Sequence, residues 1–326
     1  MGNSSAAKEF SPAAKSDCLK LIEMALTEDI GASDLDQGVD CTTDSIVPKE
    51  ATARAAFVSR ADGVVCGVEI AKLAIERWAP KLTLEVEIED GQPIKPQQTI
   101  AVMVGPAHDI LTMERTCLNF MCRLSGISSL TKKYAAEIEG TGACVLDTRK
   151  TTPGWRRLEK YAVACGGGEN HRMGLYDAIM LKDNHLAFYR SLVEDNDDTI
   201  PTTIKIARQW IDDNADSLPN GKNTILQLEV DTLEQLEVAL DTDCDIILLD
   251  NMDCDRLKKG VAMRDKASGA SSASRPGKSK ILLEASGGVN LQTIGEIAKT
   301  GVERISVGAL THSAINFDIG LDWKSA

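Results

Sequence analysis

The sequence predicts an α/β protein with two parts, a small α/β sandwich domain followed by an irregular, incomplete six-stranded β/α barrel. In the second part, short apolar runs alternate with helix-period segments, which is the pattern of strand, helix, strand units around a parallel sheet. In the first part, one strand instead alternates apolar with polar residues, as a strand wet on one face does. With 326 residues, 43% of them hydrophobic, the chain is long enough for two domains.

The sandwich domain is expected over residues 1–106, with roughly the first ten residues disordered. Ser16 and Asp17 can cap a helix that ends before Gly31, and a polar segment then runs to Thr43. The remaining expected elements are a strand over 51–58, a helix over 68–78, an alternating strand over 82–88, a turn at Asp90-Gly91 and a uniformly apolar strand over 100–104.

The barrel-like domain is expected over residues 107–326, and its C-terminal tail could pack back on the first domain. It begins with a long helix over 108–125, whose apolar stripe of Leu111, Leu118, Met121 and Cys122 has Arg115 inside it. A charge is costly to bury unless a negative group meets it. Two kinds of partner are open, a carboxylate of the protein such as Glu114 or the anion of a ligand.

Six apolar strands follow and alternate with helices. The strands are centred on Val145, Met180, Leu228, Ile247, Leu283 and Ile305, and helices are expected over 204–211, 233–240, 255–263 and 291–299. An acidic loop over 194–198 and a Ser/Gly-rich segment over 267–280 interrupt this pattern, and we assign them no chemistry.

Basic side chains gather where two of these strands end. The chain has a net charge of −13, yet residues 145–185 carry a dense group of cations beside Thr, Pro and Gly. In β/α folds the residues that follow the strands share one rim, where such folds place their sites. The group therefore suggests an anionic ligand, although a solvated loop with ordinary surface charges would look similar. Its members are Arg149, Lys150, Arg156, Arg157, Lys160, His171, Arg172 and Lys182.

Two carboxylates are expected at the same rim. Glu229 follows Leu228, and Asp250 follows Leu249. Such acids can bind Mg²⁺, hold sugar hydroxyls or face a developing positive charge. Structural partners of Arg or Lys would look the same in sequence.

Glycine-bearing loops follow the last two strands. Ser286, Gly287 and Gly288 come after one strand, and Gly308 comes after the next. Glycine lets backbone N–H groups approach an oxyanion closely. Loops at this position of a β/α barrel form its usual phosphate site. Together with arginines that suit carboxylates, they suggest a phosphorylated sugar that meets a small polyacid.

Composition excludes several classes of function. An acidic chain lacks the broad basic surface that nucleic acids require, and no apolar run approaches the ~18 residues of a membrane span. The nine cysteines have no CxxC spacing and only four histidines accompany them, which argues against a Cys/His zinc site. Free thiols, and a beginning without an apolar signal core, indicate a cytoplasmic protein.

The sequence closely resembles the quinolinate phosphoribosyltransferase family. The motifs that carry the resemblance run in order from Glu114 to Ser313, and together they are highly specific. They are Glu114-Arg115-Thr116 with Leu118-Asn119, Ser125-Gly126-Ile127, DTRKTTPG from Asp147, GGG with NHR ending at Arg172, LKDNH from Leu181, LEV from Leu228, LLDN from Leu248, EASGG from Glu284 and SVGALTHS from Ser306.

The resemblance implies an enzyme that works as a homodimer with shared active sites or as a hexamer built as a trimer of dimers. Its reaction would join quinolinate to 5-phosphoribosyl-1-pyrophosphate, with Mg²⁺ as the cofactor. The products would be nicotinate mononucleotide, pyrophosphate and CO₂ in de novo NAD biosynthesis. Positioning and electrostatics would carry the catalysis, without a covalent nucleophile.

The resemblance also implies roles for individual residues. The quinolinate site would comprise Thr148, Arg149, His171, Arg172 and Lys182, with Arg115 of the partner subunit reaching in. Lys150 and Lys182 would meet the pyrophosphate, and the 5-phosphate would lie against Ser286, Gly287, Gly288 and Gly308. Glu229, Asp250 and Lys182 would be the catalytic residues, the two acids binding ribose hydroxyls and Mg²⁺ and stabilising the oxocarbenium-like centre.

Three other functions stay open on the residues alone. Lys182 at a strand end could form a Schiff base in an aldolase-like barrel, although the surrounding arginines then lack a purpose. A non-catalytic sensor of phosphoribosyl compounds would share the anion site, but it would gain little from Glu229 and Asp250 beside phosphates. A phosphoribosyltransferase for another aromatic acid would differ only in how many cations meet the carboxylates.

Overall fold

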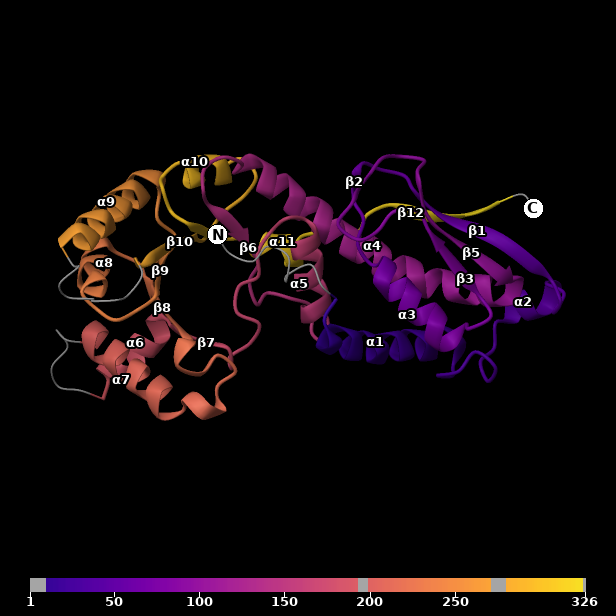
Figure 1. Cartoon of the computed structure of the whole chain (residues 1–326), viewed down its shortest axis with the longest axis horizontal. Coiled ribbons are helices and arrows are strands. Elements are labelled where there is room, and N and C mark those ends of the chain that lie inside the picture. The colour runs from indigo at the N-terminus through magenta and orange to yellow at the C-terminus, as the bar shows by residue number, and fades with distance from the viewer. Residues whose placement is uncertain (1–9, 193–198, 271–279, 325–326) are drawn as a thin grey trace. The chain divides into compact units, whose positions relative to one another are not determined.

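The computed structural model describes residues 10–192, 199–270 and 280–324, and it divides into two compact units (Figure 1). Unit 1 takes in Met1–Lys133, Lys150–Asn170 and Ala309–Ala326, and unit 2 takes in Tyr134–Arg149 and His171–Gly308. The disorder expected at the start of the chain falls almost wholly outside the described residues, as do the acidic loop and most of the Ser/Gly-rich segment.

Unit 1 is organised around an antiparallel sheet with the strand order β12-β1-β5-β3. The central strand β5 buries Ile100–Met103, which fits its uniform apolar run. The outer strand β12 comes from the last part of the sequence and pairs with β1. The bounds are β1 Thr52–Ser59, β3 Thr83–Val86, β5 Thr99–Pro106 and β12 Ile319–Trp323, and a separate two-stranded sheet joins β2 Gly63–Val64 to β4 Pro93–Ile94.

Three helices of unit 1 precede its central strand. α1 (Pro12–Ile30) is capped by Ser11, whose side chain accepts a hydrogen bond from Ala14 N. The predicted caps Ser16 and Asp17 were wrong, because Pro12 favours the first helical turn and starts the helix earlier. α2 (Cys41–Ile46), capped by Asp40, lies partly in the segment expected to be only polar. α3 (Val68–Trp78) has the expected bounds.

The long helix α4 (Ala107–Glu137) extends well beyond the expected range of 108–125. Its buried side includes Ile110, Met113, Cys117, Leu118 and Met121, whereas the side chain of Arg115 is 62% exposed and lies 3.8 Å from Glu114. The expectation that Arg115 lies in the apolar stripe was therefore wrong.

The same helix moves the division between the units away from the boundary expected at residue 106. Ser125 Oγ donates to the carbonyl of Cys66, and Ser128 Oγ donates to the carbonyl of Val64. These buried hydrogen bonds fasten α4 to unit 1, which includes the helix as far as Lys133. α5 (Arg156–Cys165) and α11 (Ala309–His312) belong to unit 1 as well.

Unit 2 is built on a six-stranded parallel sheet with the order β6-β11-β10-β9-β8-β7. All six predicted strands are present, and β6 and β7 lie at the two edges, so the sheet stays open. The predicted fold class, a small sandwich followed by an incomplete six-stranded β/α unit, is confirmed. The strands are β6 Cys144–Leu146, β7 Ala178–Leu181, β8 Ile225–Val230, β9 Ile246–Asp250, β10 Leu282–Ser286 and β11 Arg304–Ser306.

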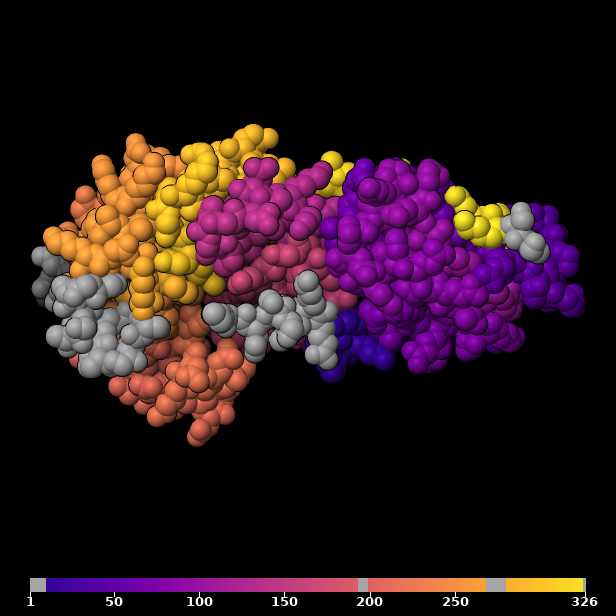
Figure 2. All heavy atoms as spheres, turned by 45° about the horizontal axis from the view of Figure 1, so that its top comes forward, coloured from indigo at the N-terminus to yellow at the C-terminus, as the bar shows by residue number. Residues whose placement is uncertain are grey.

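Helices connect these strands, and Figure 2 shows α9 and the segment around α10 side by side on the surface of unit 2. The helices are α6 Asp183–Arg190, α7 Thr199–Asp213, α8 Leu233–Leu240, α9 Cys254–Ala270 and α10 Ile294–Ala298, with 3₁₀ turns at Ala215–Ser217 and Gly221–Asn223. Neither α5 nor α6 was predicted. No helix within the described ranges combines the length and the hydrophobicity of a bilayer-spanning segment.

Candidate active site

One face of the parallel sheet of unit 2 is apolar, and the other carries polar side chains together with apolar ones such as Leu248. Aligned residues of parallel strands point to the same side, and Glu229 and Glu284 both align with Leu248, while Asp250 aligns with Ser286. These four polar residues therefore share a face. The alternate residues, including Leu228, Leu249 and Leu283, are fully buried. The sheet thus directs its polar side chains to one side, and they end at the carboxyl rim where the site was predicted.

Lys182 and Glu229 meet at this rim. Lys182 follows β7 and begins α6, and its Nζ forms a close ion pair with the carboxylate of Glu229 on β8. The main-chain N–H of Lys182 donates to His185 Nδ1 at 3.0 Å, so His185 caps the helix. Two of the three predicted catalytic residues are therefore in direct contact.

His171 is held by three neighbours. Its main-chain N–H donates to Asp147 Oδ1 at 2.8 Å, and its Nδ1 accepts a hydrogen bond from the N–H of Arg172 at 2.8 Å. Its Nε2 lies 3.2 Å from Oε1 of Glu284, and only 9% of the side chain is exposed. Since Nδ1 accepts a hydrogen bond, Nε2 is the ring nitrogen that is left to face Glu284.

Glu284 is a fully buried carboxylate beneath the site, and it was not assigned a role from the sequence. It lies 2.9 Å from Arg304 Nε and 3.3 Å from Gln227 Nε2. Burial acts to raise the pKa of Glu284, yet the contacts with His171 and then Arg304 outweigh it and bring that pKa down to about 2. The signal in the sequence is a lone acid inside the apolar run Ile281–Ala285.

Arg149 and Arg172 are the least compensated charges of the site. Burial lowers the pKa of Arg172, the positive charge of Arg149 lowers it further, and Asp177 opposes both. Arg149 Nε is buried without a hydrogen-bond partner in the described part of the chain, and Arg172 Nη1 donates to the carbonyl of Ala178. Two neighbouring guanidinium groups in this state have the charge that an anion with more than one negative group would require.

The predicted phosphate loop lies beside Asp250. Asn251 N donates to the carbonyl of Ser286 at 2.9 Å, and Asn251 Nδ2 donates to Asp250 Oδ2 at 2.7 Å. Gly287 and Gly288 have φ values of +93° and +62°, and a Cβ on Gly287 would come within 2.1 Å of Asn251 Oδ1. Glycine is therefore required at Gly287 by both backbone conformation and space.

The sixth strand ends near the first. Val307 N donates to the carbonyl of Leu146 at 2.8 Å, so Gly308, which follows β11, and Thr148, which follows β6, belong to adjacent strand ends. Unit 2 thus brings together Thr148, Arg149, His171, Arg172, Lys182, Glu229, Asp250, Ser286, Gly287, Gly288 and Gly308.

The rest of the basic group belongs to unit 1. Lys150 and Arg115 are both in this unit, as is α5, which carries Arg156, Arg157 and Lys160. Arg157 pairs with Asp17 at 2.9 Å, Arg156 Nε donates to Thr151 Oγ1, and Lys160 is fully buried. Treating all these cations as one cluster was wrong, because α5 turns three of them into contacts of unit 1.

The acids of the rim fit a magnesium ion only in part. In the portion of the chain that the structure describes, no three His, Cys, Asp or Glu side chains gather as a metal site. Mg²⁺ is usually bound through one or two carboxylates together with substrate phosphates. Glu229 and Asp250 are a donor set of that kind, which a phosphate-bearing substrate would complete.

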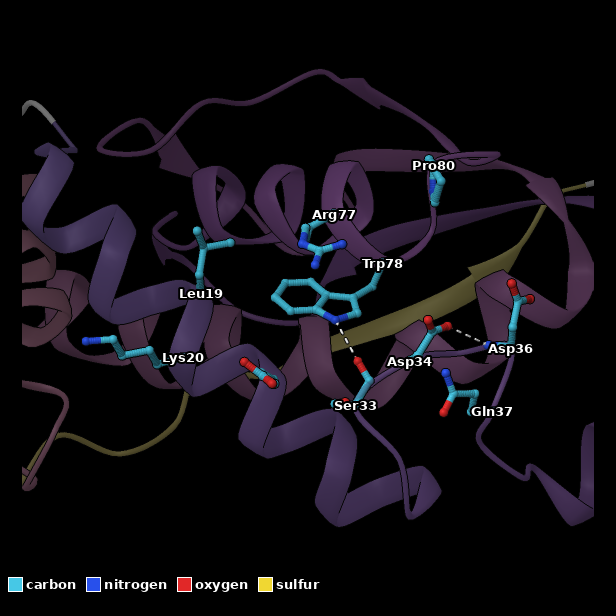
Figure 3. Close-up of a pocket in the computed structure, with 10 residues that line it drawn as sticks. Leu19, Lys20, Ser33, Asp34, Asp36, Gln37, Arg77, Trp78 and Pro80 are labelled. Atoms are coloured by element: carbon cyan, nitrogen blue, oxygen red, sulfur yellow. Dashed lines mark hydrogen bonds between the residues drawn. The ribbon is translucent and has the colours of Figure 1, made fainter.

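A separate pocket of about 480 Å³ lies in unit 1, between α1, the end of α3 and the loop after α1 (Figure 3). Trp78 Nε1 donates to the carbonyl of Ser33 at 3.0 Å, and Arg77 lies 5.5 Å from the Trp78 ring centroid. No predicted site residue lines this pocket. Its lining is Leu19, Lys20, Glu23, Ser33, Asp34, Asp36, Gln37, Arg77, Trp78 and Pro80.

Comparison with known proteins identifies the family of the chain. Residues 40–125 match the model of the quinolinate phosphoribosyl transferase N-terminal domain, and residues 127–322 match that of the C-terminal domain. The chain belongs to the quinolinate phosphoribosyltransferase family. All the predicted site residues except Arg115 fall within the second match, and Arg115 falls within the first.

Relatives of this phosphoribosyltransferase family match nearly the whole chain. The nicotinate-nucleotide pyrophosphorylase [carboxylating] of Mycobacterium leprae is 37% identical over 291 residues, 89% of this chain and 93% of that protein. The solved structure of the Francisella tularensis nicotinate-nucleotide pyrophosphorylase has a TM-score of 0.79 at 31% identity and covers 95% of this chain and 97% of that one. The Ehrlichia chaffeensis enzyme has a TM-score of 0.77 at 36% identity, covering 94% and 98%.

Proposed function

We propose that this member of the family transfers the phosphoribosyl group of 5-phosphoribosyl-1-pyrophosphate to quinolinate, with decarboxylation, in de novo NAD biosynthesis. The observation that carries the proposal is the neighbouring, incompletely compensated pair Arg149 and Arg172. Quinolinate has two carboxylates on adjacent ring carbons, which suit two converging guanidinium groups. Relatives called nicotinate-nucleotide pyrophosphorylase [carboxylating] support the same reaction.

Quinolinate would lie near the end of β6, which Thr148 and Arg149 follow. Arg149 and Arg172 would hold its carboxylates, with Thr148 and His171 beside them and Lys182 at the other side of the rim. Glu284 would hold the His171 ring in place from below. Binding charge to preorganised donors in this way needs little rearrangement during the reaction.

The phosphoribosyl donor would lie across the ends of β8 to β11. Ser286, Gly287, Gly288 and Gly308 would offer the close backbone approach that its 5-phosphate needs, and Lys150 and Lys182 would meet the pyrophosphate. Glu229 and Asp250 would contact the ribose hydroxyls and hold Mg²⁺. The ion would neutralise part of the pyrophosphate charge.

The chemistry needs positioning more than a reactive side chain. The bond from ribose C1 to the pyrophosphate oxygen breaks, and its electron pair leaves with pyrophosphate. Glu229 and Asp250 stabilise the positive charge that develops on the ribose. The ring nitrogen of quinolinate forms the new bond to C1 and becomes cationic, so it can accept the electrons released when the adjacent carboxylate leaves as CO₂. A proton then replaces that carboxylate.

The Schiff-base alternative fits the site less well. A Schiff-base lysine must offer a free amine to a carbonyl compound, whereas Lys182 is engaged with the carboxylate of Glu229. Trapping with borohydride and a carbonyl substrate would distinguish the two readings, and we expect no covalent adduct.

We propose in addition that the protein is a homodimer with shared active sites, or a hexamer of such dimers, in which Arg115 of the partner subunit completes the quinolinate site. The exposed side chain of Arg115 supports this. Mixing Arg115→Ala with Arg172→Ala subunits should restore about a quarter of the activity, since half of randomly paired dimers contain one intact site of two. Mixtures that stay inactive would contradict sharing.

We also propose a cytoplasmic location. All nine cysteines are free thiols, and free thiols persist in reducing compartments. Cell fractionation with an antibody against the protein would test this, and recovery in an organelle fraction would refute it.

The decisive experiment incubates the purified protein with quinolinate, phosphoribosyl pyrophosphate and Mg²⁺ and follows nicotinate mononucleotide and CO₂. Nicotinate serves as the parallel substrate, because it lacks the second carboxylate. Product from quinolinate alone would support the proposal. Product from nicotinate or another aromatic acid alone would move the protein to a related phosphoribosyltransferase, and no product from any acid would favour a sensor.

A further inference from the structure

Unit 1 contains a buried ion pair that the proposed chemistry does not use. Glu159 on α5 is fully buried, and its Oε1 lies 2.7 Å from Nη2 of Arg123 on α4. The attraction within a buried pair repays the cost of desolvation only when further hydrogen bonds satisfy both groups. Both members of this pair make such bonds, which lead to Thr152 and to the segment from Thr311 to Ala314.

The carboxylate of Glu159 holds the segment after Lys150. Thr152 Oγ1 donates to Glu159 Oε1 at 2.9 Å, and Thr152 N donates to Glu159 Oε2 at 3.2 Å. This fixes both the main chain and the side chain of Thr152. Because proline follows at position 153, the backbone on the far side of Thr152 is restricted as well.

The guanidinium of Arg123 holds a second segment, which closes the network. Its Nη2 donates to the carbonyl of Thr311 at 2.5 Å, and its Nη1 donates to the carbonyl of Ala314 at 3.0 Å. The buried hydroxyl of Thr311 in turn donates to the carbonyl of Lys150 at 2.8 Å. The stretch from Lys150 to Thr152 is therefore tied at both ends to one ion pair.

We propose that Arg123, Glu159 and Thr311 are positioning residues for Lys150. This inference rests on the proposed function, in which Lys150 meets the pyrophosphate of the donor. A lysine side chain is long and flexible, so its ammonium group reaches one place reliably only when its main chain is fixed. The network fixes that main chain without touching substrate, and such positioning lowers the entropy lost when the donor is bound.

The test compares two threonine variants of the full-length protein. Thr311→Val removes only the hydroxyl that holds the Lys150 carbonyl and keeps the shape of the side chain. Thr131→Val is the matched control, because Thr131 is also fully buried in unit 1 and donates to a main-chain carbonyl, that of Ile127, at 2.8 Å within α4. Each variant is measured by steady-state kinetics for both substrates and by hydrogen exchange of the peptide that contains residues 149–155.

We expect Thr311→Val to raise the KM for phosphoribosyl pyrophosphate about fivefold, the effect of one hydrogen bond, with less than about a twofold change in the KM for quinolinate. Exchange at Lys150–Thr152 should become faster in Thr311→Val and stay unchanged in Thr131→Val. Glu159→Gln should raise the KM for phosphoribosyl pyrophosphate more strongly, again with little change in the KM for quinolinate. Asp322→Asn, which alters the partly exposed pair of Arg60 with Asp322, should change neither KM.

Several results would overturn the inference. These are equal changes in Thr311→Val and Thr131→Val, an equal rise of both KM values, or faster exchange without any change in the donor KM. If the unmodified protein makes no product at all, the proposed function fails separately. The exchange measurement then still decides whether this network fixes Lys150–Thr152, since it needs no substrate.

Discussion

The charged side chains of unit 2 fall into two groups, those that form ion pairs and those that do not. Lys182 is paired with Glu229, and Glu284 is paired with His171 and Arg304. Arg149 and Arg172, which lie near each other, make no ion pair within the described residues. A charge that is partly removed from water without an ion-pair partner is costly, so Arg149 and Arg172 are the charges of this unit that a bound anion would stabilise most.

The largest expected effect comes from an uncompensated charge. Arg172→Ala should lower kcat/KM for quinolinate by about 10³-fold, because a charge-assisted contact to a carboxylate is lost in a partly desolvated site. Thermal unfolding should change little, since Arg172 makes no ion pair that supports the fold. Normal turnover in this variant would refute the assignment.

Arg256→Ala is the matched control for that variant. Arg256 is also an arginine of unit 2 whose guanidinium donates to a main-chain carbonyl, that of Asp231, but it is not among the predicted site residues. We expect kcat/KM within about twofold of the unmodified protein.

The next largest effect is expected for Glu284, a charge that forms ion pairs, and it concerns the free energy of unfolding. Since the folded pKa of Glu284 is about 2, below its ordinary 4.5, its contribution is present above pH 4.5 and is lost as pH falls toward 2. Glu284→Gln should therefore lower the free energy of unfolding at pH 7 by about 3 kcal/mol. Chemical denaturation should also show that the unmodified protein loses about 2 kcal/mol more than the variant between pH 5 and pH 3. Parallel pH curves would show that folding does not shift the pKa of Glu284.

A bound dianion should supply the partner that Arg149 and Arg172 lack and should therefore stabilise the fold. Quinolinate at 100 times its Kd should raise the free energy of unfolding by about 2.7 kcal/mol through mass action. Arg149→Ala should abolish most of this shift, and nicotinate should produce a smaller one at the same concentration. Equal stabilisation by both acids would mean that the second carboxylate is not recognised.

The smallest effect on stability is expected where a compensated pair is open to solvent. The side chain of Lys182 is 40% exposed, so Lys182→Met should change the free energy of unfolding by less than about 1 kcal/mol. Its activity should fall far more than its stability, because the same side chain is proposed to meet both substrates. A loss of stability as large as that of Glu284→Gln would show that solvent exposure does not determine how much an ion pair contributes to the free energy of unfolding.

Patterns that are local in the sequence predicted most of the fold. The six strands of unit 2 are short apolar runs, and the residues after them lie at a common rim because parallel strands share one direction. The segment from Lys150 to Lys182 was harder, because α5 is short and carries Arg156, Arg157 and Lys160, which looked like part of the anion site. The position of a residue around the helix axis, rather than its nearness in sequence to the site, decides where its side chain points.

Partners far apart in the sequence could not be predicted. The role of Glu284 depends on the register that aligns β10 with β11 and, through β9, with β8, and no local pattern encodes that register. The same holds for Thr311 and Lys150, which are 161 positions apart. The site residues were identified through strand ends and family motifs, whereas the groups that support them required the three-dimensional arrangement.

The pairing of β1 with β12 has a consequence for how the chain folds. Arg60 and Asp322 are joined across this pair although they are 262 positions apart, and the whole of unit 2 lies between them in the sequence. During synthesis on the ribosome, β1 would therefore have an unpaired edge until unit 2 has been made. An open strand edge is a site for pairing with other chains, so premature termination before Ile319 should yield a protein that aggregates even when unit 2 folds.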